Sequence, residues 1–386
     1  MTTTIDNEQK TLNVPNLRFP EFEGEWEEKR LSDIADLSKG IGISKDQLSA
    51  DGEPCILYGE LYTKYKSETI KEVISKTNID NTKLVKSKAN DVIIPCSGET
   101  AEEIATARCV LKDDVLLGGD LNIIRLHGYD GSFMSYQLNG KRKYDIAKVA
   151  QGVSVVHLYG EHLKNIKTFN PSLNEQKKIA NLLSLLDERI STQNKIIEDL
   201  KKLKSAISDR LFKNIKGDVI TLSEICDIVK GKQINGEYLT ESGEYYVMNG
   251  GTEPSGYYGD YNVDANTISI SEGGNSCGYV QFNTSPFWSG GHCYSIQNIA
   301  DHVDNLYLYH YLKSNEEVIM RLRIGSGLPN IQKTDLTMFK IKVPTFEQQI
   351  TISTFLSSLE RKAEIEERIQ NVILKQKLYL LQQMFI

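Results

Sequence analysis

The residues of this chain that could perform chemistry do not form a recognisable catalytic set. Six cysteines are scattered without a Cys-x-x-Cys pair, so the spacing that a zinc site needs is absent. The sequence has neither a G-x-x-x-x-G-K-[ST] loop for ATP nor a G-x-G-x-x-G loop for a dinucleotide. We therefore expect reduced thiols that lie mostly in the core, and no metal or cofactor bound by this chain.

Two weaker patterns offer catalytic alternatives. Asn170-Pro171-Ser172 faintly resembles the Asn-Pro-Pro-aromatic corner that holds the target base in adenine methyltransferases, but the second proline and the aromatic residue are missing. A proline in the first turn of a helix explains the segment better. His157 and His162 are five residues apart, and the second half of the chain does not repeat them. His157 is thus either a loop histidine or a contact to a base or phosphate.

Other polar and aromatic residues are suited to DNA contacts. Lys and Arg neutralise phosphates, Ser, Asn, Gln and His donate to or accept from base edges, and Tyr stacks. Many of the 19 tyrosines lie among glycine-rich turns, which a tyrosine-rich hairpin core would explain equally well. The candidate DNA-contacting residues are Lys39, Tyr58, Lys64, Tyr65, Lys66, Ser97, Lys141, Arg142, Gln151, Ser154, His157, Lys230, Lys232, Asn249, Asn275, Arg321, Arg323 and Gln332.

The charge limits how such a surface could work. A formal net charge of −7 argues against a protein that coats DNA throughout, because backbone affinity comes from Lys and Arg. The basic residues nevertheless cluster locally in both halves of the chain. This pattern favours local DNA contacts, with other subunits completing the clamp around the duplex.

The elements that must position these residues are duplicated. Residues 171–212 align without a gap to residues 344–385, at a constant offset of 173 (344 − 171). The fronts of the halves also match, since Leu31 to Gly40 corresponds to Leu222 to Gly231 at an offset of 191 (222 − 31). The offset shrinks mainly between residues 59 and 89. A constant frame with variable inserts is typical of two readers of different targets.

The coarse organisation follows from this repeat. At 386 residues the chain is long enough for two or three domains, and we expect divisions at 1–170, 171–213, 214–343 and 344–386. Short apolar runs such as 92–94, 121–126, 267–270 and 294–296 predict strands, and 133–150 and 305–323 predict helices. The N-terminus lacks a basic, apolar leader and no membrane span is present, so we expect a cytoplasmic protein.

Each half ends in a long amphipathic helix. Apolar residues recur at three-to-four spacing over about 42 residues, roughly 60 Å at 1.5 Å per residue, which exceeds one small domain. Pairing of the two helices into a coiled coil is favoured over packing of each on its own domain. The candidate coiled-coil and subunit-docking residues are Pro171, Gln176, Ile179, Leu183, Ile190, Ile197, Leu200, Ile207, Pro344, Gln349, Ile352, Leu356, Ile369, Ile373 and Leu380.

The order of globular domain, P-x-x-x-[EQ]-Q-x-x-I helix, second domain and second such helix resembles the specificity subunit of type I restriction-modification systems. Pro171 to Ala180 and Pro344 to Gln349 resemble that family's helix openings, and Val14 to Trp26 is similar to its N-terminal arm. Gln348 replaces Glu175 in the second opening. The resemblance covers essentially the whole chain.

The resemblance implies an α+β fold: two mixed α/β target-recognition domains in pseudo-twofold repeat, separated by two long helices that form an antiparallel coiled coil. It implies a non-catalytic reader of double-stranded DNA, each domain reading half of a bipartite target. The implied partners are two modification subunits, which methylate adenine with S-adenosylmethionine, and restriction subunits, which hydrolyse ATP with magnesium. The alternatives are a coiled-coil scaffold that does not read DNA, and an adenine methyltransferase.

Overall fold

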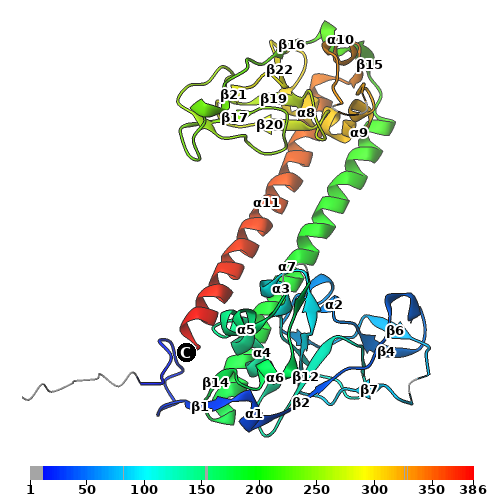
Figure 1. Ribbon diagram of the computed structural model, residues 1–386. Coiled ribbons are helices and arrows are strands. Elements are labelled where there is room, and N and C mark those ends of the chain that lie inside the picture. Colours follow the sequence, from blue (N-terminus) through cyan, green and yellow to red (C-terminus); the bar gives the residue numbers. More distant parts are fainter. Residues whose placement is uncertain (1–11, 81, 153–154, 326, 328) are drawn as a thin grey trace, which may run out of the picture. The chain divides into compact units, whose positions relative to one another are not determined.

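The computed structural model describes residues 12–80, 82–152, 155–325, 327 and 329–386. The chain divides into two compact units: unit 1 comprises residues 1–194 and 369–386, and unit 2 comprises residues 195–368. Two continuous helices, α7 (Leu173–Asn214) and α11 (Phe346–Gln383), each contribute one part to each unit (Figure 1). The expected division into two recognition domains and two separate spacer helices stays a prediction.

Unit 1 is a mixed α/β unit built around two sheets of five strands, ordered β2-β12-β8-β10-β5 and β3-β6-β4-β11-β7. Its strands are β1 (Glu27–Arg30), β2 (Ala35–Lys39), β3 (Leu48–Ser49), β4 (Glu53–Ile56), β5 (Thr69–Ile70), β6 (Ser75–Thr77), β7 (Val85–Lys86), β8 (Asp91–Pro95), β9 (Ser97–Gly98), β10 (Arg108–Val110), β11 (Leu116–Leu117), β12 (Leu121–Leu126), β13 (Val156–His157) and β14 (Lys167–Asn170). Its short helices are α1 (Leu31–Ile34), α2 (Glu60–Thr63), α3 (Ala101–Ile104), α4 (Gly131–Asn139), α5 (Lys143–Val149) and α6 (Gly160–Leu163).

The continuous apolar run of β8 shows why this sheet forms. Val92 and Ile94 belong to the core that contains Met134 of α4, whereas Ile93 belongs to the core on the opposite face. Successive side chains of a strand point to opposite faces, so a strand covered on both faces is apolar throughout. The strand predicted at 92–94 is confirmed.

Unit 2 repeats this frame with fewer strands. Its strands are β15 (Asp218–Thr221), β16 (Asp227–Lys230), β17 (Tyr245–Met248), β18 (Tyr257–Tyr258), β19 (Thr267–Ser271), β20 (Val280–Asn283), β21 (Trp288–Ser289), β22 (Cys293–Gln297) and β23 (Lys340–Val343), and its helices are α8 (Asn305–Ser314), α9 (Glu316–Met320) and α10 (Lys333–Thr337). The antiparallel pairs β16-β22-β19 match β2-β12-β8, and β15-β23 matches β1-β14.

The two shorter predicted helices are each interrupted. The segment 133–150 forms α4 and α5, because Gly140 leaves the helical conformation and its amide binds the Tyr136 carbonyl. The segment 305–323 divides at Asn315 into α8 and α9. In both units an aspartate, Asp130 or Asp304, accepts a backbone hydrogen bond at the start of the first helix.

The long helices run antiparallel within each unit. In unit 1 Asp187 and Asn194 of α7 bind Lys377 and Gln370 of α11. In unit 2, Lys201 and Lys204 of α7 pair with Glu367 and Glu360 at 2.6 and 2.7 Å. The predicted stripe is buried at Ile179, Leu183, Ile197, Leu356 and Ile373, partly buried at Ile190, Leu200, Ile207, Ile352 and Leu380, and exposed at Ile369. The expected antiparallel helix pairing is confirmed.

The cysteines follow the sequence prediction. All six are free and buried. Burial raises the pKa of the Cys55 and Cys96 thiols to about 11, so both stay protonated near neutral pH. No group of three or more His, Cys, Asp or Glu side chains in the described part of the chain could hold a metal ion. No described helix is long and apolar enough to cross a bilayer.

Candidate nucleic-acid interface

One surface of unit 1 gathers several of the predicted DNA-contacting residues. The β9-β13 ladder places Ser97 opposite His157, and an isolated bridge places Gln151 opposite His157, with backbone N–H···O distances of 2.8 and 2.7 Å. Lys39, the last residue of β2, lies with its ammonium 5.7 Å from the ring centroid of Tyr159. The Tyr159 ring stacks on His157 at 6.1 Å. We name these five residues the Lys39 cluster.

Tyr159 was missed by the sequence analysis. It is 45% exposed and lies two residues after His157, directly before the glycine that begins α6. Its position between a predicted DNA contact and a glycine is a signal in the sequence that could have identified this aromatic residue. Ser154, another candidate beside this ladder in sequence, lies outside the described residues.

Unit 2 builds the same backbone arrangement with different side chains. Asn330 forms bridges with Gly273 and Ile324, as His157 does with Ser97 and Gln151. Lys230, the last residue of β16, occupies the place of Lys39 in the repeat. Glu272 corresponds to Cys96, because the Glu272 carbonyl accepts from Ile331 N–H at 2.9 Å as the Cys96 carbonyl accepts from Leu158 N–H at 2.8 Å.

Glu272 organises this second surface. Its Oε1 accepts from Lys230 Nζ at 2.6 Å and from the Tyr294 hydroxyl at 3.0 Å, and its Oε2 lies 3.7 Å from His292 Nδ1. Burial and this carboxylate raise the pKa of Tyr294, which therefore stays protonated as a donor. Lys230, Glu272, His292, Tyr294 and Asn330 are named the Lys230 cluster.

Further predicted residues adjoin the Lys230 cluster. Asn249 Oδ1 accepts from the His292 backbone N–H at 3.0 Å, and Gln332 Nε2 donates to Asn330 Oδ1 at 3.0 Å. Asn275 is exposed and follows Gly274. The φ angle of Gly274 is 75°, which residues other than glycine rarely adopt. The carbonyl of Lys232 accepts from Trp288 Nε1 at 2.9 Å, and its side chain is exposed.

Other candidates lie elsewhere. Tyr65 is buried and its hydroxyl accepts from Ile74 N–H, so it is left out of the proposed interface. Lys64 donates to Glu60 and Ser75, both at 2.6 Å, and Lys66 donates to the Tyr62 carbonyl. The remaining candidates in this group are partly buried or exposed and belong to neither cluster as defined: Tyr58, Lys141, Arg142, Arg321 and Arg323.

Arg142 has a structural task of its own. Its guanidinium donates to the Ile386 carbonyl at 3.1 Å, pairs with Asp145 and lies over the Phe169 ring. Lys64 and Lys66 line a cleft of about 770 Å³ between residues 64–72 and the unit 1 parts of α7 and α11. Arg142 therefore ties its domain to the end of the chain, whereas Lys64 and Lys66 bind within their own segment and border this cleft.

A charged joint attaches each unit's domain to its helices. In unit 1 Lys377 pairs with Glu68 at 2.6 Å and with Asp187 at 2.5 Å, and the Tyr136 hydroxyl donates to Asp187. Burial raises the pKa of Glu68. Burial opposes ionisation of Asp187 as well, but the charge and hydrogen bond of Lys377 outweigh it and lower the pKa of Asp187.

Unit 2 repeats this joint less completely. Lys204 pairs with Glu360 at 2.7 Å, and the Tyr309 hydroxyl donates to Glu360 at 3.0 Å. The two lysines and the two acids occupy repeat-related positions, at an offset of 173. His310 lies next to Tyr309, within hydrogen-bonding distance (2.9 Å) of Ser357, and burial lowers its pKa to about 4.

The glutamines of the two helix openings are buried joints. Gln176 accepts from Asp130 N–H at 2.9 Å and donates to the Pro171 carbonyl. Gln349 accepts from Asp304 N–H at 2.8 Å and donates to the Pro344 carbonyl. These two glutamines, with the buried prolines Pro171 and Pro344, tie each helix to its domain. They are therefore left out of the proposed docking surface.

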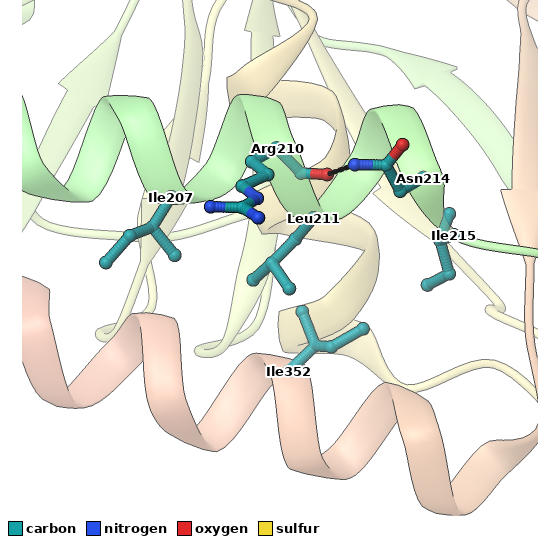
Figure 2. A pocket seen from close by; sticks show the side chains of 6 residues that line it. All are labelled: Ile207, Arg210, Leu211, Asn214, Ile215 and Ile352. Carbon is teal, nitrogen blue, oxygen red and sulfur yellow. Dashed lines mark hydrogen bonds between the residues drawn. The ribbon is translucent and has the colours of Figure 1, made fainter.

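The helix ends differ in what covers them. In unit 1 the N-terminal arm, residues 12–26, covers the opening of α7: Arg18 binds Glu175 through two hydrogen bonds of 2.7 and 2.8 Å, and Leu17 N–H donates to the Gln383 carbonyl. In unit 2 the matching surface is an open groove of about 390 Å³, lined by Ile207, Arg210, Leu211, Asn214, Ile215 and Ile352 (Figure 2).

The sequence matches one protein family twice. A model of the type I restriction modification DNA specificity domain matches residues 23–202 and again residues 214–375. The chain belongs to this family. Its two matched ranges correspond to the two halves of the internal repeat, and the family's description agrees with the expectation of a DNA-recognising, non-catalytic chain.

Individual specificity subunits are similar over different lengths. The type I restriction enzyme MjaVIII specificity subunit of Methanocaldococcus jannaschii is 25% identical over 411 residues, covering 96% of this chain and 93% of the relative. A putative type I specificity subunit of Mycoplasma genitalium is 32% identical over 165 residues, 41% of this chain and 43% of the relative. A putative subunit of Mycoplasma pneumoniae is 34% identical over 146 residues, and the match spans 39% of its length.

Solved structures share the fold. The crystal structure of a type I restriction-modification S subunit from M. genitalium has a TM-score of 0.71 at 21% identity, with 97% of this chain and 99% of that chain covered. A chain from a study of complex assembly and conformational transition of the type I R-M system has a TM-score of 0.55 at 15% identity, with 93% and 97% covered. The fold class expected for the specificity family is confirmed.

Proposed function

We propose that this chain is the DNA sequence-recognition subunit of a type I restriction-modification complex and that each unit reads one half of a bipartite target. The observation that carries the proposal is the pair of equivalent surfaces, the Lys39 cluster and the Lys230 cluster. In both clusters a lysine ends an edge strand, β2 or β16, and lies near a short set of backbone bridges. His157 and Cys96 are replaced by Asn330 and Glu272, so one frame presents two chemistries.

The helices supply the second part of the proposal. Large apolar residues are exposed on α7 and α11, namely Leu203 and Phe355 in unit 2 and Val372 and Leu378 in unit 1, and exposed apolar patches mark sites of protein association. We assign the exposed apolar residues of each unit, with the groove at Ile207 and Ile352 in unit 2, to the docking of two modification subunits. Their S-adenosylmethionine, and the ATP and magnesium of restriction subunits, would then be bound by those partners in the cytoplasm.

Mapping of N6-methyladenine tests the function directly. A host without its own adenine modification would express this chain, its modification subunit, or both. A bipartite motif that appears only with both subunits supports the proposal. Methylation by this chain alone contradicts it, and a complex that forms without any methylated motif favours a scaffold that does not read DNA.

The spacing of the target offers a separate test of the helices. Half-sites should lie about one DNA turn apart, because proteins with two DNA-contacting units read faces of the duplex separated by a helical turn. Adding a turn of helix at matched positions of α7 and α11 should lengthen the unspecified spacer while both half-sites keep their sequence. An unchanged spacer would remove the helices from the ruler role.

A further inference from the structure

Lys39 and Lys230 end equivalent strands but have different neighbours. Lys39 lies over an aromatic ring and beside the position of Cys96, whose thiol is protonated near neutral pH. Lys230 instead donates to Glu272, a carboxylate whose side chain is only 5% exposed. The positive charge of Lys230 is therefore balanced within its own unit, whereas the Lys39 cluster contains no acidic residue.

Glu272 restrains Lys230 as well as neutralising it. An ammonium group has three N–H donors, and the carboxylate occupies one of them at 2.6 Å. The Lys230 side chain is 53% exposed, so the remaining donors can reach a ligand. A lysine paired in this way attracts phosphates less strongly, but the carboxylate fixes the direction in which its free N–H groups point.

The same carboxylate is incompletely satisfied. Its Oε2 is buried and has no hydrogen-bond partner among the described residues. His292 Nδ1, at 3.7 Å, is too distant for a hydrogen bond, and the His292 side chain is 61% exposed. A buried acceptor without a donor is unfavourable in the free protein, so the cluster is complete only when a further donor arrives.

A G·C base pair offers both missing partners on its major-groove edge. Guanine presents O6 and N7 as acceptors, and the paired cytosine presents the N4 amino group as a donor. The Lys230 ammonium matches the guanine acceptors. The free Oε2 of Glu272 matches the cytosine amino group once the exposed His292 ring turns aside.

We infer that Lys230 and Glu272 together read a G·C pair in the half-site bound by unit 2, and that Lys39 binds a phosphate in unit 1. Glu272 also acts as the positioning residue for Lys230. This inference rests on the proposed function, because it assigns the Lys230 cluster to the DNA-facing surface of unit 2.

The experiment uses the complex of the full chain with its modification subunit and competes DNA duplexes that carry single base-pair changes in each half-site. Exchange of residues 214–343 with those of another family member identifies the half-site of unit 2. The variants are Lys230→Met, Lys230→Arg and Glu272→Gln, and Lys39→Met is the matched control in unit 1. Thermal unfolding of each variant shows whether it has folded.

In the wild-type complex we expect one G·C position in the unit 2 half-site to resist substitution. Lys230→Met should reduce discrimination at that position about 10- to 100-fold, the range of one good side-chain pair with a base, and leave the other half-site unchanged. Lys230→Arg should retain the guanine preference, and Glu272→Gln should relax it. Lys39→Met should weaken binding to all sequences and lower the salt dependence by about one phosphate contact.

The outcomes separate this inference from the function itself. If the wild-type complex does not bind any bipartite sequence, the proposed function fails. If it reads a bipartite target but Lys230→Met weakens all sequences uniformly, Lys230 is a phosphate contact and the inference is wrong. Because Lys230 is exposed, its variants remain informative even if Glu272→Gln does not fold.

Discussion

The openings of α7 and α11 have the same backbone frame and different coverings. In unit 1 Phe19 of the arm packs against the core around Ile179, and Lys178 contacts Phe19 and Glu21. In unit 2 the positions that correspond to Ile179 and Lys178 are Ile352 and Thr351, and they line open grooves. Both halves of the repeat therefore have the same helix opening, but only the opening in unit 1 is covered by an N-terminal arm.

The difference comes from how the chain enters each unit. The arm is free to fold back before β1, and Trp26 fills the core between Phe133 and Phe385. Unit 2 is entered directly from α7, and Gly217 stands at the repeat position of Trp26. A Cβ at Gly217 would lie 2.5 Å from the Val343 carbonyl oxygen, so no larger residue fits there. Connectivity thus decides which helix end is sealed.

Removing Trp26 should have the largest effect on this comparison. Trp26 is 2% exposed, and Trp26→Ala should lower the free energy of unfolding of unit 1 by about 3–5 kcal/mol through lost burial and a cavity. Leu211→Ala, in the open groove of unit 2, should cost about 1 kcal/mol because the side chain is already partly exposed. Urea unfolding followed by site-resolved hydrogen exchange measures both. Equal losses would show that the arm does not seal unit 1.

Acid should weaken unit 2 through His310. Burial lowers its pKa to about 4, against an ordinary value near 6.5, so the unfolded chain binds more protons between these values. Stability from neutral His310 is fully present above pH 6.5 and is lost as the pH falls toward 4, by about 3 kcal/mol in total. Comparison of wild type with His310→Gln by unfolding at several pH values checks this. A parallel pH dependence of the two proteins would contradict it.

The helix spans could be predicted because their signals are local. Apolar periodicity and the duplicated openings indicated helices within 171–213 and 344–386, and the structure has Leu173–Asn214 and Phe346–Gln383. The second sheet of unit 1 was not predicted, because strands such as Leu48–Ser49 and Val85–Lys86 are only two residues long and depend on their partners.

The candidate site was predictable only in part, because some of its contacts join residues that are distant in the sequence. Lys39, Ser97, Gln151 and His157 were named from their types, and the structure brings them together. Glu272 was missed because it lies in a glycine-rich turn that read only as a backbone feature. Its partner Lys230 is 42 residues away in sequence, and nothing local signals the pair. Tyr65 looked like a stacking residue, but tertiary packing places its ring in the core.

Glu175→Gln sharpens the comparison at a single position, since the second opening naturally has Gln348. Glu175 is buried and accepts from Arg18 and from Trp26 Nε1, so loss of its charge should cost about 2 kcal/mol in unit 1. The reverse change is Gln348→Glu. Gln348 is exposed and no arm covers it, so this change should alter the free energy of unfolding by less than about 0.5 kcal/mol. If the two changes cost the same in thermal unfolding, the arm does not explain why the openings differ.

The most direct use of the open groove, with only a small effect on folding, is expected for Ile215→Lys. Ile215 lines both cavities at the end of α7 and is partly exposed, so an added ammonium can reach solvent and should lower stability by about 1 kcal/mol or less. If a modification subunit docks there, the charge must be buried on binding, and the affinity should fall about 10-fold. Val219→Lys, on an exposed residue of β15 that does not line the groove, controls for the added charge. Titration of each labelled variant with the modification subunit measures its affinity. Equal affinities for the two variants would show that the modification subunit docks away from the groove.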